Sequence, residues 1–172
     1  MLFRSTITPK TVTLTATKEY DKTTDLAGAV TVGTGVGTET LAYSGALANS
    51  AFVADNATNY ITAISLLDGT NGGLASNYQL PTLDHANAPV TINKRALTVT
   101  LGGDAIKTYD QTTAALMANL TFTPTNIISG DDVSIVTAGG TATYDTKHAS
   151  AGQTKTVNRS EERRVGKECR SR

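Results

Sequence analysis

The sequence predicts an all-β protein built from two tandem modules. Threonine, a β-branched residue that favours strands, accounts for 31 of the 172 residues. No long segment has the 3.6-residue periodicity of an amphipathic helix. Segment 7–21 is similar to segment 92–110, so the chain repeats itself. The repeat length of roughly 85 residues suits a small β-sandwich, so we expect tandem β-sandwich-like modules.

The repeat fixes the expected module boundaries. Both copies open with Ile-x-x-basic, continue as an alternating threonine and aliphatic strand, and reach Tyr-Asp just before a Thr-Thr pair. Ile7 corresponds to Ile92 at an offset of 85 residues, and Tyr20 corresponds to Tyr109 at an offset of 89, so copy two has a four-residue insertion. We expect a complete module over 7–91 and a second module over 92–158 that lacks its final strands.

The first strand of each module is expected to be buried on one face only. In copy one, Val12, Leu14 and Ala16 alternate with threonines, which predicts an aliphatic inner face and a threonine outer face. In copy two the same inward register is occupied by Leu97, Val99 and Leu101.

The remaining elements follow in order along each copy. A short helical turn is expected after each Thr-Thr pair, over 26–30 and 113–120, which leaves β-grasp-like modules with one short helix each as the alternative fold. Turns feeding strands are expected over 37–43 and 130–136. Further strands are expected in copy one over 61–67, 77–80 and 88–92. Copy two stops near Val157, the expected counterpart of Ile64. We therefore expect it to expose an unpaired sheet edge and part of its core, and to be much less stable than copy one.

The last residues, 159–172, differ in composition from the rest. They hold six of the 15 basic residues, three of the 15 acidic residues and the only cysteine, Cys169. The string is similar to the in-frame translation of a common DNA-sequencing adapter, so we interpret it as an artefactual tail. The body keeps nine basic and twelve acidic residues, a formal charge of −3, which argues against nucleic acid as a partner. The body also has no cysteine and no apolar run of membrane-spanning length, so we expect no thiolate chemistry and no membrane insertion.

Three short signatures resemble the YDG-type repeat of large bacterial surface adhesins of the filamentous-haemagglutinin and autotransporter type. The signatures are Lys-x-Tyr-Asp-x-Thr-Thr, Gly-Asp-Asp-Val and Ala-Ser-Asn-Tyr. The family-motif residues are Tyr20, Asp21, Thr23 and Thr24, their counterparts Tyr109, Asp110, Thr112 and Thr113, then Gly130, Asp131, Asp132, Asn77 and Tyr78. The chain departs from the family at Lys22 and Gln111, which stand where the family usually has glycine, so the turn geometry is expected to differ.

The resemblance implies a secreted, extracellular protein displayed on the bacterial cell surface, with no enzymatic activity and no cofactor. Its tandem modules would act as a stalk that projects a binding region, with neighbouring modules of the same chain as partners. The alternative is that the module itself is adhesive and binds a host glycan or protein.

Other candidate sites are better explained as turns or surface residues. The glycines at 33, 35 and 37 lack the helix that a phosphate loop needs, and the Asp68 loop and Gly130-Asp131-Asp132 lack the spacing of an EF-hand. His85 and His148 are isolated in expected loops, so no metal site and no catalytic residue is predicted. Asn56 and Asn119 begin glycosylation sequons. Calcium at module junctions and glycosylation at these two asparagines are left open.

Overall fold

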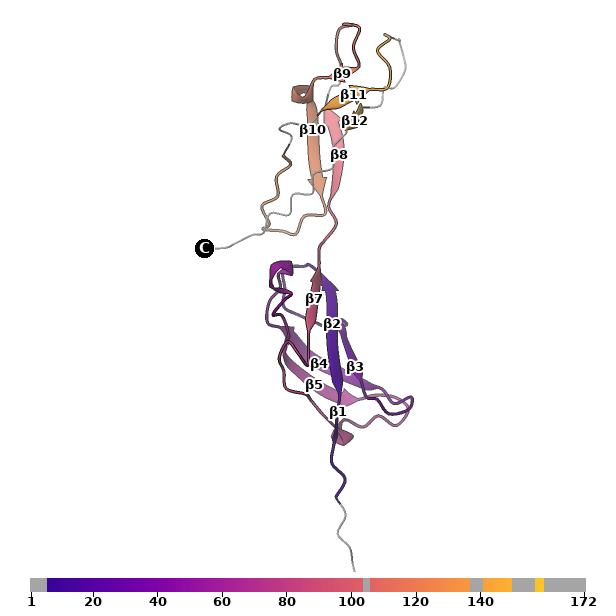
Figure 1. Ribbon diagram of the computed structural model, residues 1–172, viewed down its shortest axis with the longest axis vertical. Helices are drawn as coiled ribbons and strands as arrows, with labels where there is room; N and C mark the ends of the chain where they lie inside the picture. The colour runs from indigo at the N-terminus through magenta and orange to yellow at the C-terminus, as the bar shows by residue number, and fades with distance from the viewer. Residues whose placement is uncertain (1–5, 104–105, 137–140, 150–156, 160–172) are drawn as a thin grey trace, which may run out of the picture. The chain divides into compact units, whose positions relative to one another are not determined.

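The computed structural model describes residues 6–103, 106–136, 141–149 and 157–159. These residues form strands joined by turns and by three-residue 3-10 turns, without an α-helix among them (Figure 1). The prediction of an all-β protein is therefore confirmed. The chain divides into two compact units, Met1–Arg95 and Ala96–Arg172, which are described separately below.

Unit 1 contains seven strands in the part of the chain that is described. They are β1 (Lys10–Thr11), β2 (Thr13–Glu19), β3 (Val30–Gly33), β4 (Leu41–Ala48), β5 (Ile61–Asp68), β6 (Tyr78–Gln79) and β7 (Val90–Asn93). β2 is the centre of a three-stranded sheet in the order β3-β2-β7, β4 pairs with β5, and β1 pairs with β6. Two 3-10 turns, η1 (Val53–Asp55) and η2 (Ala75–Asn77), precede β5 and β6.

The core of unit 1 lies on the aliphatic face that the sequence predicts. Val12, Leu14 and Ala16 are only 2, 1 and 3% exposed, whereas the threonines between them are exposed. They belong to one buried cluster with residues from the second half of the unit, namely Ala46, Ala48, Ile61, Ile64, Val90 and Ile92. Alternation along β2 thus directs one face into the core and leaves the other in water.

The first long strand and the last strand of unit 1 are neighbours. β2 pairs in parallel with β7, with Ala16 opposite Val90 and Lys18 opposite Ile92. Ile92 and Asn93, which the sequence places at the start of the second module, therefore close the sheet of unit 1. Because the two strands run in the same direction, the chain enters β2 at one end of the pair and leaves β7 at the opposite end.

Two asparagine side chains supply backbone-like hydrogen bonds in unit 1. Asn59 is completely buried; its Oδ1 accepts from the Ser50 N–H at 3.0 Å and its Nδ2 donates to the Ser50 carbonyl at 2.9 Å. Asn56 bonds Ile92 of β7 in the same way, accepting at 2.8 Å and donating at 3.0 Å. Each amide satisfies one backbone donor and one acceptor that would otherwise lack a strand partner.

Unit 2 repeats the beginning of this arrangement. Its described elements are β8 (Thr98–Gly103), β9 (Ala114–Ala115), η3 (Met117–Asn119), β10 (Leu120–Thr125), β11 (Ala142–Tyr144) and β12 (Val157–Arg159). β8 pairs antiparallel with β10 as β2 pairs with β3, and β11 lies between β9 and β12. Tyr144 pairs with Val157 as Ala48 pairs with Ile61, so Val157 corresponds to Ile61 and not to Ile64.

The inner face of the second copy is partly exposed, as expected for a module that lacks its final strands. Leu97, Val99 and Leu101 are each 42% exposed. In unit 1 the corresponding face belongs to a buried cluster with residues of β4 and β5, namely Ala46, Ala48, Ile61 and Ile64, whereas the described part of unit 2 places only β10 beside β8. Without a covering layer, the alternating pattern forms a strand but cannot bury it.

Two further expectations need correction. Residues 131–136 form no strand, although their counterparts lead into β4. The first half of β4 pairs with Ser65–Asp68 of β5, whose counterparts in copy two would be Glu-Glu-Arg-Arg at 161–164. The helical turn expected over 26–30 is a hydrogen-bonded turn, and 113–120 contains β9 and η3, so the described residues hold no helix of the β-grasp kind.

Candidate functional site

The best-defined local site is the turn that carries the Tyr-Asp motif. In each copy a lysine, an aspartate and a threonine at spacing Lys-x-x-Asp-x-Thr form a closed set of hydrogen bonds, which we call the Lys-Asp-Thr clasp. It consists of Lys18, Asp21 and Thr23 in unit 1 and of Lys107, Asp110 and Thr112 in unit 2.

In unit 1 the clasp closes the turn after β2. The Asp21 carboxylate accepts from the Thr23 N–H at 2.9 Å and from the Thr23 hydroxyl at 3.0 Å, which is an Asx-type turn. Lys18 Nζ lies 2.6 Å from the same Oδ1 and donates to the Thr23 and Asp25 carbonyls at 3.2 and 2.8 Å. The Lys18 side chain is only 10% exposed, so its ammonium is held by oxygen atoms of the turn and not by water alone.

Unit 2 repeats these contacts almost atom for atom. Asp110 Oδ1 accepts from the Thr112 N–H and hydroxyl, both at 2.9 Å. Lys107 Nζ lies 2.7 Å from Asp110 Oδ1 and donates to the Thr112 carbonyl at 2.8 Å. The same ammonium lies 5.6 Å from the ring centroid of Tyr144, within cation–π range. The clasp therefore forms in a unit whose inner face is largely uncovered, which shows that it is a local structure.

The clasp shifts the acidity of its aspartates. For Asp21, burial acts to raise the pKa, but the hydrogen bonds from Lys18 and Thr23 outweigh it, so the pKa lies below the ordinary 3.8. For Asp110 the Lys107 hydrogen bond is the main cause, joined by the two bonds from Thr112, and the pKa falls to about 2. Both carboxylates are therefore ionised and paired at neutral pH.

The residue inside the clasp has a glycine-like backbone. Lys22 has φ of 69° and Gln111 has φ of 65°, both in the left-handed region. The turn geometry that glycine would adopt most easily is therefore kept, although neither residue is glycine. Lys22 and Gln111 therefore adopt a conformation that is strained for a residue with a Cβ.

The other motif residues anchor the clasp to its surroundings. The Thr24 carbonyl accepts from the Ala48 N–H at 2.8 Å, and the Thr113 carbonyl accepts from the Tyr144 N–H at 2.7 Å. Tyr20 is half-buried and packs on Phe52 with ring centroids 6.3 Å apart. Tyr109, its counterpart, is 54% exposed. The backbone links are thus the same in both units, whereas the packing of the tyrosine exists only where the core is complete.

The second and third signatures lie away from the clasps. Gly130 has φ of 84° in a turn where the Asp131 N–H donates to the Ile128 carbonyl at 3.0 Å, and Asp132 is exposed. Asn77 is the exposed last residue of η2, and Tyr78 follows it in β6.

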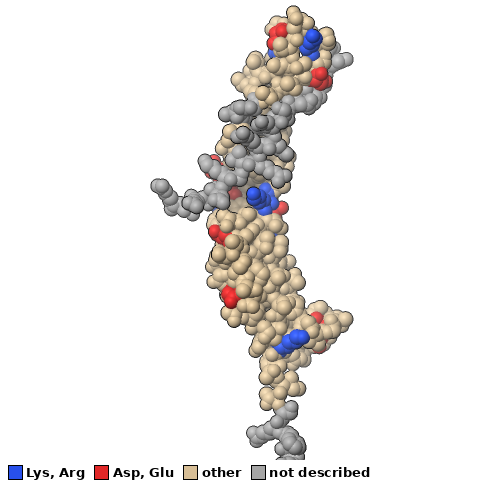
Figure 2. Space-filling model, viewed as in Figure 1, with Lys and Arg blue, Asp and Glu red and all other residues tan. Residues whose placement is uncertain are grey.

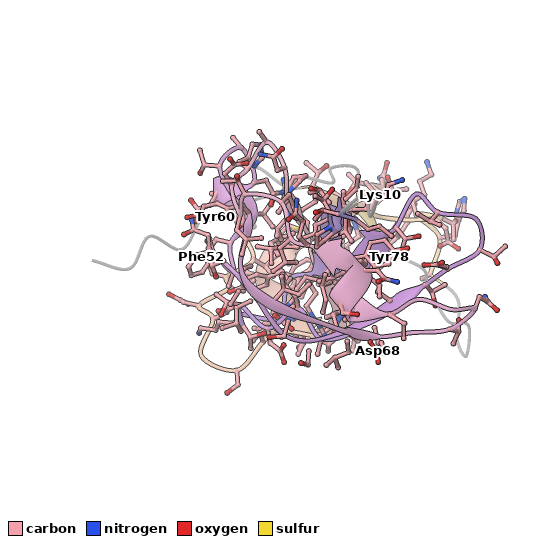
Figure 3. The ribbon with its side chains drawn as sticks, turned by 90° about the horizontal axis from the view of Figure 1, so that it is seen from below. Lys10, Phe52, Tyr60, Asp68 and Tyr78 are labelled. Atoms are coloured by element: carbon pink, nitrogen blue, oxygen red, sulfur yellow. The ribbon has the colours of Figure 1, made fainter. Side chains whose placement is uncertain are left out.

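Tyr78 is 7% exposed, and its hydroxyl donates to the Glu39 carboxylate. The hydrogen bond to Glu39 raises the pKa of Tyr78 above 10.0. Figure 3 shows Tyr78 on the same side of the view as Lys10, with Phe52 and Tyr60 opposite. The structure therefore does not gather the predicted motif residues into one site.

The remaining candidates behave as turn or surface residues. Asp68 accepts from the Ala75 N–H at 2.8 Å, and His85 and His148 are exposed as expected, with His85 Nδ1 2.8 Å from the Asn59 carbonyl. Within the described ranges there is no cluster of three or more His, Cys, Asp or Glu side chains suited to a metal ion. Asn119 is exposed, whereas the amide of Asn56 is engaged by Ile92.

The sequence analysis does not identify the role of Lys18 and Lys107 in holding the clasps together. Their positions at fixed spacing before Tyr-Asp were visible in the repeat, and a lysine three residues before an aspartate can reach it when the chain turns between them. Because the alternating pattern predicts a strand up to Tyr-Asp, it does not indicate this contact. Asn56 and Asn59 were missed for a different reason, since no local pattern marks an amide that bonds a distant strand.

Fold and site together define an all-β repeat unit whose first long strand ends in a Lys-Asp-Thr clasp. Residues 93–163 match the family model of the YDG domain. Searches of curated proteins and of solved structures return no match. No helix in the described part of the chain is long and apolar enough to cross a membrane. On the face shown in Figure 2, charged side chains are scattered and most of the described surface is neither basic nor acidic.

Proposed function

We propose that this chain is a stalk segment of a secreted bacterial surface adhesin and that its repeats, as β-sandwich-like modules in tandem, project a binding region from the cell. The observation that carries the proposal is the parallel pairing of β2 with β7. A unit that the chain enters at one end and leaves at the other adds length for each module inserted, as a spacer requires. An extracellular location follows from the proposal, as does the lack of an enzymatic role.

The side-chain chemistry of the described residues supports a structural role. Within the clasps, the carboxylates of Asp21 and Asp110 accept hydrogen bonds from the backbone and hydroxyl groups of Thr23 and Thr112. A clasp that forms in both units is a device for ending the first strand in the same way in every repeat. Repetition of one local structure is what tandem modules need in order to fold independently along a chain.

The second candidate function is an adhesive module that binds a glycan or protein itself. A shallow groove of about 340 Å³ favours it, since it lies along β4 and is lined by Ala27, Gly28 and residues 41–46. The ligand in this case would pair with the edge of β4 or rest on its apolar side chains.

Binding of the folded full chain to glycan and host-matrix arrays separates the two functions, once circular dichroism has shown cooperative unfolding of a β protein. The stalk proposal expects no saturable binding. Reproducible binding that is lost in Ala42→Arg, within the groove, and kept in Thr15→Arg, on the outer face of β2, would instead support the adhesive module.

A further inference from the structure

The loop after β5 carries the one Asn-Gly pair in the sequence, Asn71-Gly72. Asn71 is exposed and has φ of 55°, and Gly72 has φ of 89°. The Gly73 N–H donates to the Thr70 carbonyl at 3.1 Å and closes the turn. Two successive positive φ angles are typical of a type I′ turn, for which Asn-Gly is a preferred pair. The turn therefore places the unhindered backbone nitrogen of a glycine directly after a side-chain amide.

Hydrogen bonds fasten this loop to the segment before β4. Asn71 Nδ2 donates to the Thr38 carbonyl at 3.0 Å. The Thr70 N–H donates to the Thr40 hydroxyl at 3.0 Å, and the Thr40 N–H donates to the Thr70 carbonyl at 3.2 Å. The two backbones are in close contact, because a Cβ at Gly73 would collide with the Thr40 carbonyl. The Asn71 amide is thus one of the groups that hold the loop in place.

We propose that Asn71 deamidates spontaneously in the folded protein and that the reaction releases loop 69–73 from the segment before β4. The Gly72 N–H has no hydrogen-bond acceptor among the described residues, so it is free to give its proton to water. The nitrogen then attacks Cγ of Asn71, a C–N bond forms, the Cγ–Nδ2 bond breaks, and ammonia leaves with a proton that replaces the one lost. Water opens the resulting five-membered succinimide at either carbonyl, which gives aspartate or isoaspartate. The net change takes up one water and releases one ammonia, with no oxidation or reduction.

Either product weakens the attachment of the loop. A carboxylate and the Thr38 carbonyl are both acceptors, so the hydrogen bond between positions 71 and 38 is lost. The new charge is also repelled by Glu39, whose Oε1 lies 3.9 Å from the place of a Cβ on Gly72. Isoaspartate in addition inserts a methylene into the main chain of the turn. Because the reaction needs no enzyme, the modified fraction grows with the time that the chain has spent in water.

The test is incubation of the full chain at neutral pH and physiological temperature, followed by mass spectrometry that locates each converted asparagine. Wild type is expected to convert at Asn71 before any other asparagine, to both aspartate and isoaspartate, with one ammonia released for each conversion. The conversion should be slower than in a peptide of residues 66–77, because the bond to Thr38 restrains the side chain in the folded loop.

A pair of threonine variants tests this restraint. Thr40→Val removes the hydroxyl that accepts from the Thr70 N–H, so the folded chain should convert faster at Asn71. Thr62→Val on β5 is the matched control. It removes a hydroxyl that donates to the Leu47 carbonyl at 3.2 Å, away from the loop in sequence, and should leave the rate at position 71 unchanged.

Amide exchange measures the release of the loop. Asn71→Asp reproduces one product directly, and in it the Thr40 and Thr70 amides should exchange about fivefold faster, the equivalent of one lost hydrogen bond. The Ile61 amide, which donates to the Ala88 carbonyl at 2.9 Å in the core, should not change. Asn49→Asp is the matched control, because Asn49 is exposed in the same unit and its side chain has no hydrogen-bond partner in the described part of the chain.

A folded chain that keeps Asn71 intact while the peptide converts would overturn the proposal, as would conversion no faster at Asn71 than at the other asparagines. An unchanged rate in Thr40→Val would contradict the restraint assigned to the loop. If the Thr40 and Thr70 amides exchange in Asn71→Asp and in the aged wild type as they do in fresh wild type, the release of the loop is wrong.

Discussion

At the scale of single residues, the most instructive position is the one inside each clasp. Lys22 and Gln111 hold left-handed backbone angles, which cost a residue with a Cβ roughly 1–2 kcal/mol. The clasp supplies the compensation, because two hydrogen bonds to Asp21 and a lysine held by turn carbonyls exist only when the chain bends here. A short motif can therefore impose a conformation that its central residue disfavours.

Replacing Lys22 with glycine should relieve this strain. We expect Lys22→Gly to stabilise unit 1 by about 0.5–1 kcal/mol, because glycine adopts a positive φ readily but gives up more freedom on folding. Lys22→Asn should fall between glycine and wild type, and Lys22→Val should be destabilising. Urea unfolding at neutral pH measures all three. A glycine variant as unstable as the valine variant would mean that the backbone angle is not the source of strain.

The paired carboxylate predicts a dependence on acid. The folded-state pKa of Asp21 is lowered, so the stability it contributes is present above its ordinary pKa of 3.8 and is lost as the pH falls through the folded value. Asp21→Asn should therefore lower the free energy of unfolding at neutral pH, and the difference from wild type should shrink below pH 3.8. Urea midpoints over this pH range measure it.

Glu19→Gln is the matched control for this experiment, since Glu19 lies on the same strand and makes an exposed ion pair with Arg95 at 3.1 Å. Loss of this ion pair should change the free energy of unfolding at neutral pH by about 0–1 kcal/mol. A larger effect in Glu19→Gln than in Asp21→Asn would contradict the importance given to the clasp.

At the scale of elements, the sequence predicts what is local and misses what is distant. Alternation identified β2 and its buried face, because Val12, Leu14 and Ala16 meet a complete core. The same alternation does not decide burial in β8, because burial depends on strands that the pattern does not contain. The turn at Tyr-Asp can be predicted because an aspartate readily bonds backbone and hydroxyl groups two residues further on. The packing of Tyr20 on Phe52 cannot, because it depends on a residue 32 positions away.

The side-chain amide of Asn56 should hold β7 in place. Asn56→Ala removes both bonds to Ile92 and leaves a backbone N–H and a carbonyl without these partners, a cost of about 1–3 kcal/mol for each buried group that water does not reach. We expect faster amide exchange at Ile92, while the amides that join β4 to β5 change less. The same substitution at the other sequon, Asn119→Ala, serves as the control and should leave the amide exchange of unit 1 unchanged.

At the scale of the whole molecule, the two units should differ in stability. Unit 1 has one large buried cluster, drawn mainly from β2, β4, β5, β6 and β7, whereas the described buried hydrophobic residues of unit 2 are Leu120, Ala142 and Tyr144. Native-state hydrogen exchange should therefore show slow amides in β2 and β5 and fast amides in β8 and β10. Equal protection in both units would contradict this.

The parallel pairing of β2 with β7 also decides how unit 1 responds to tension. A pull on the chain at Thr13 and at Asn93 acts along the two strands in opposite directions. The hydrogen bonds between the two strands are then loaded together in shear, so they must break nearly simultaneously. The hydrogen bonds of a hairpin pulled apart at its open end break one after another. Any tether built from such units resists stretching at the joint between its first and last strands, and the clasp lies where that joint ends.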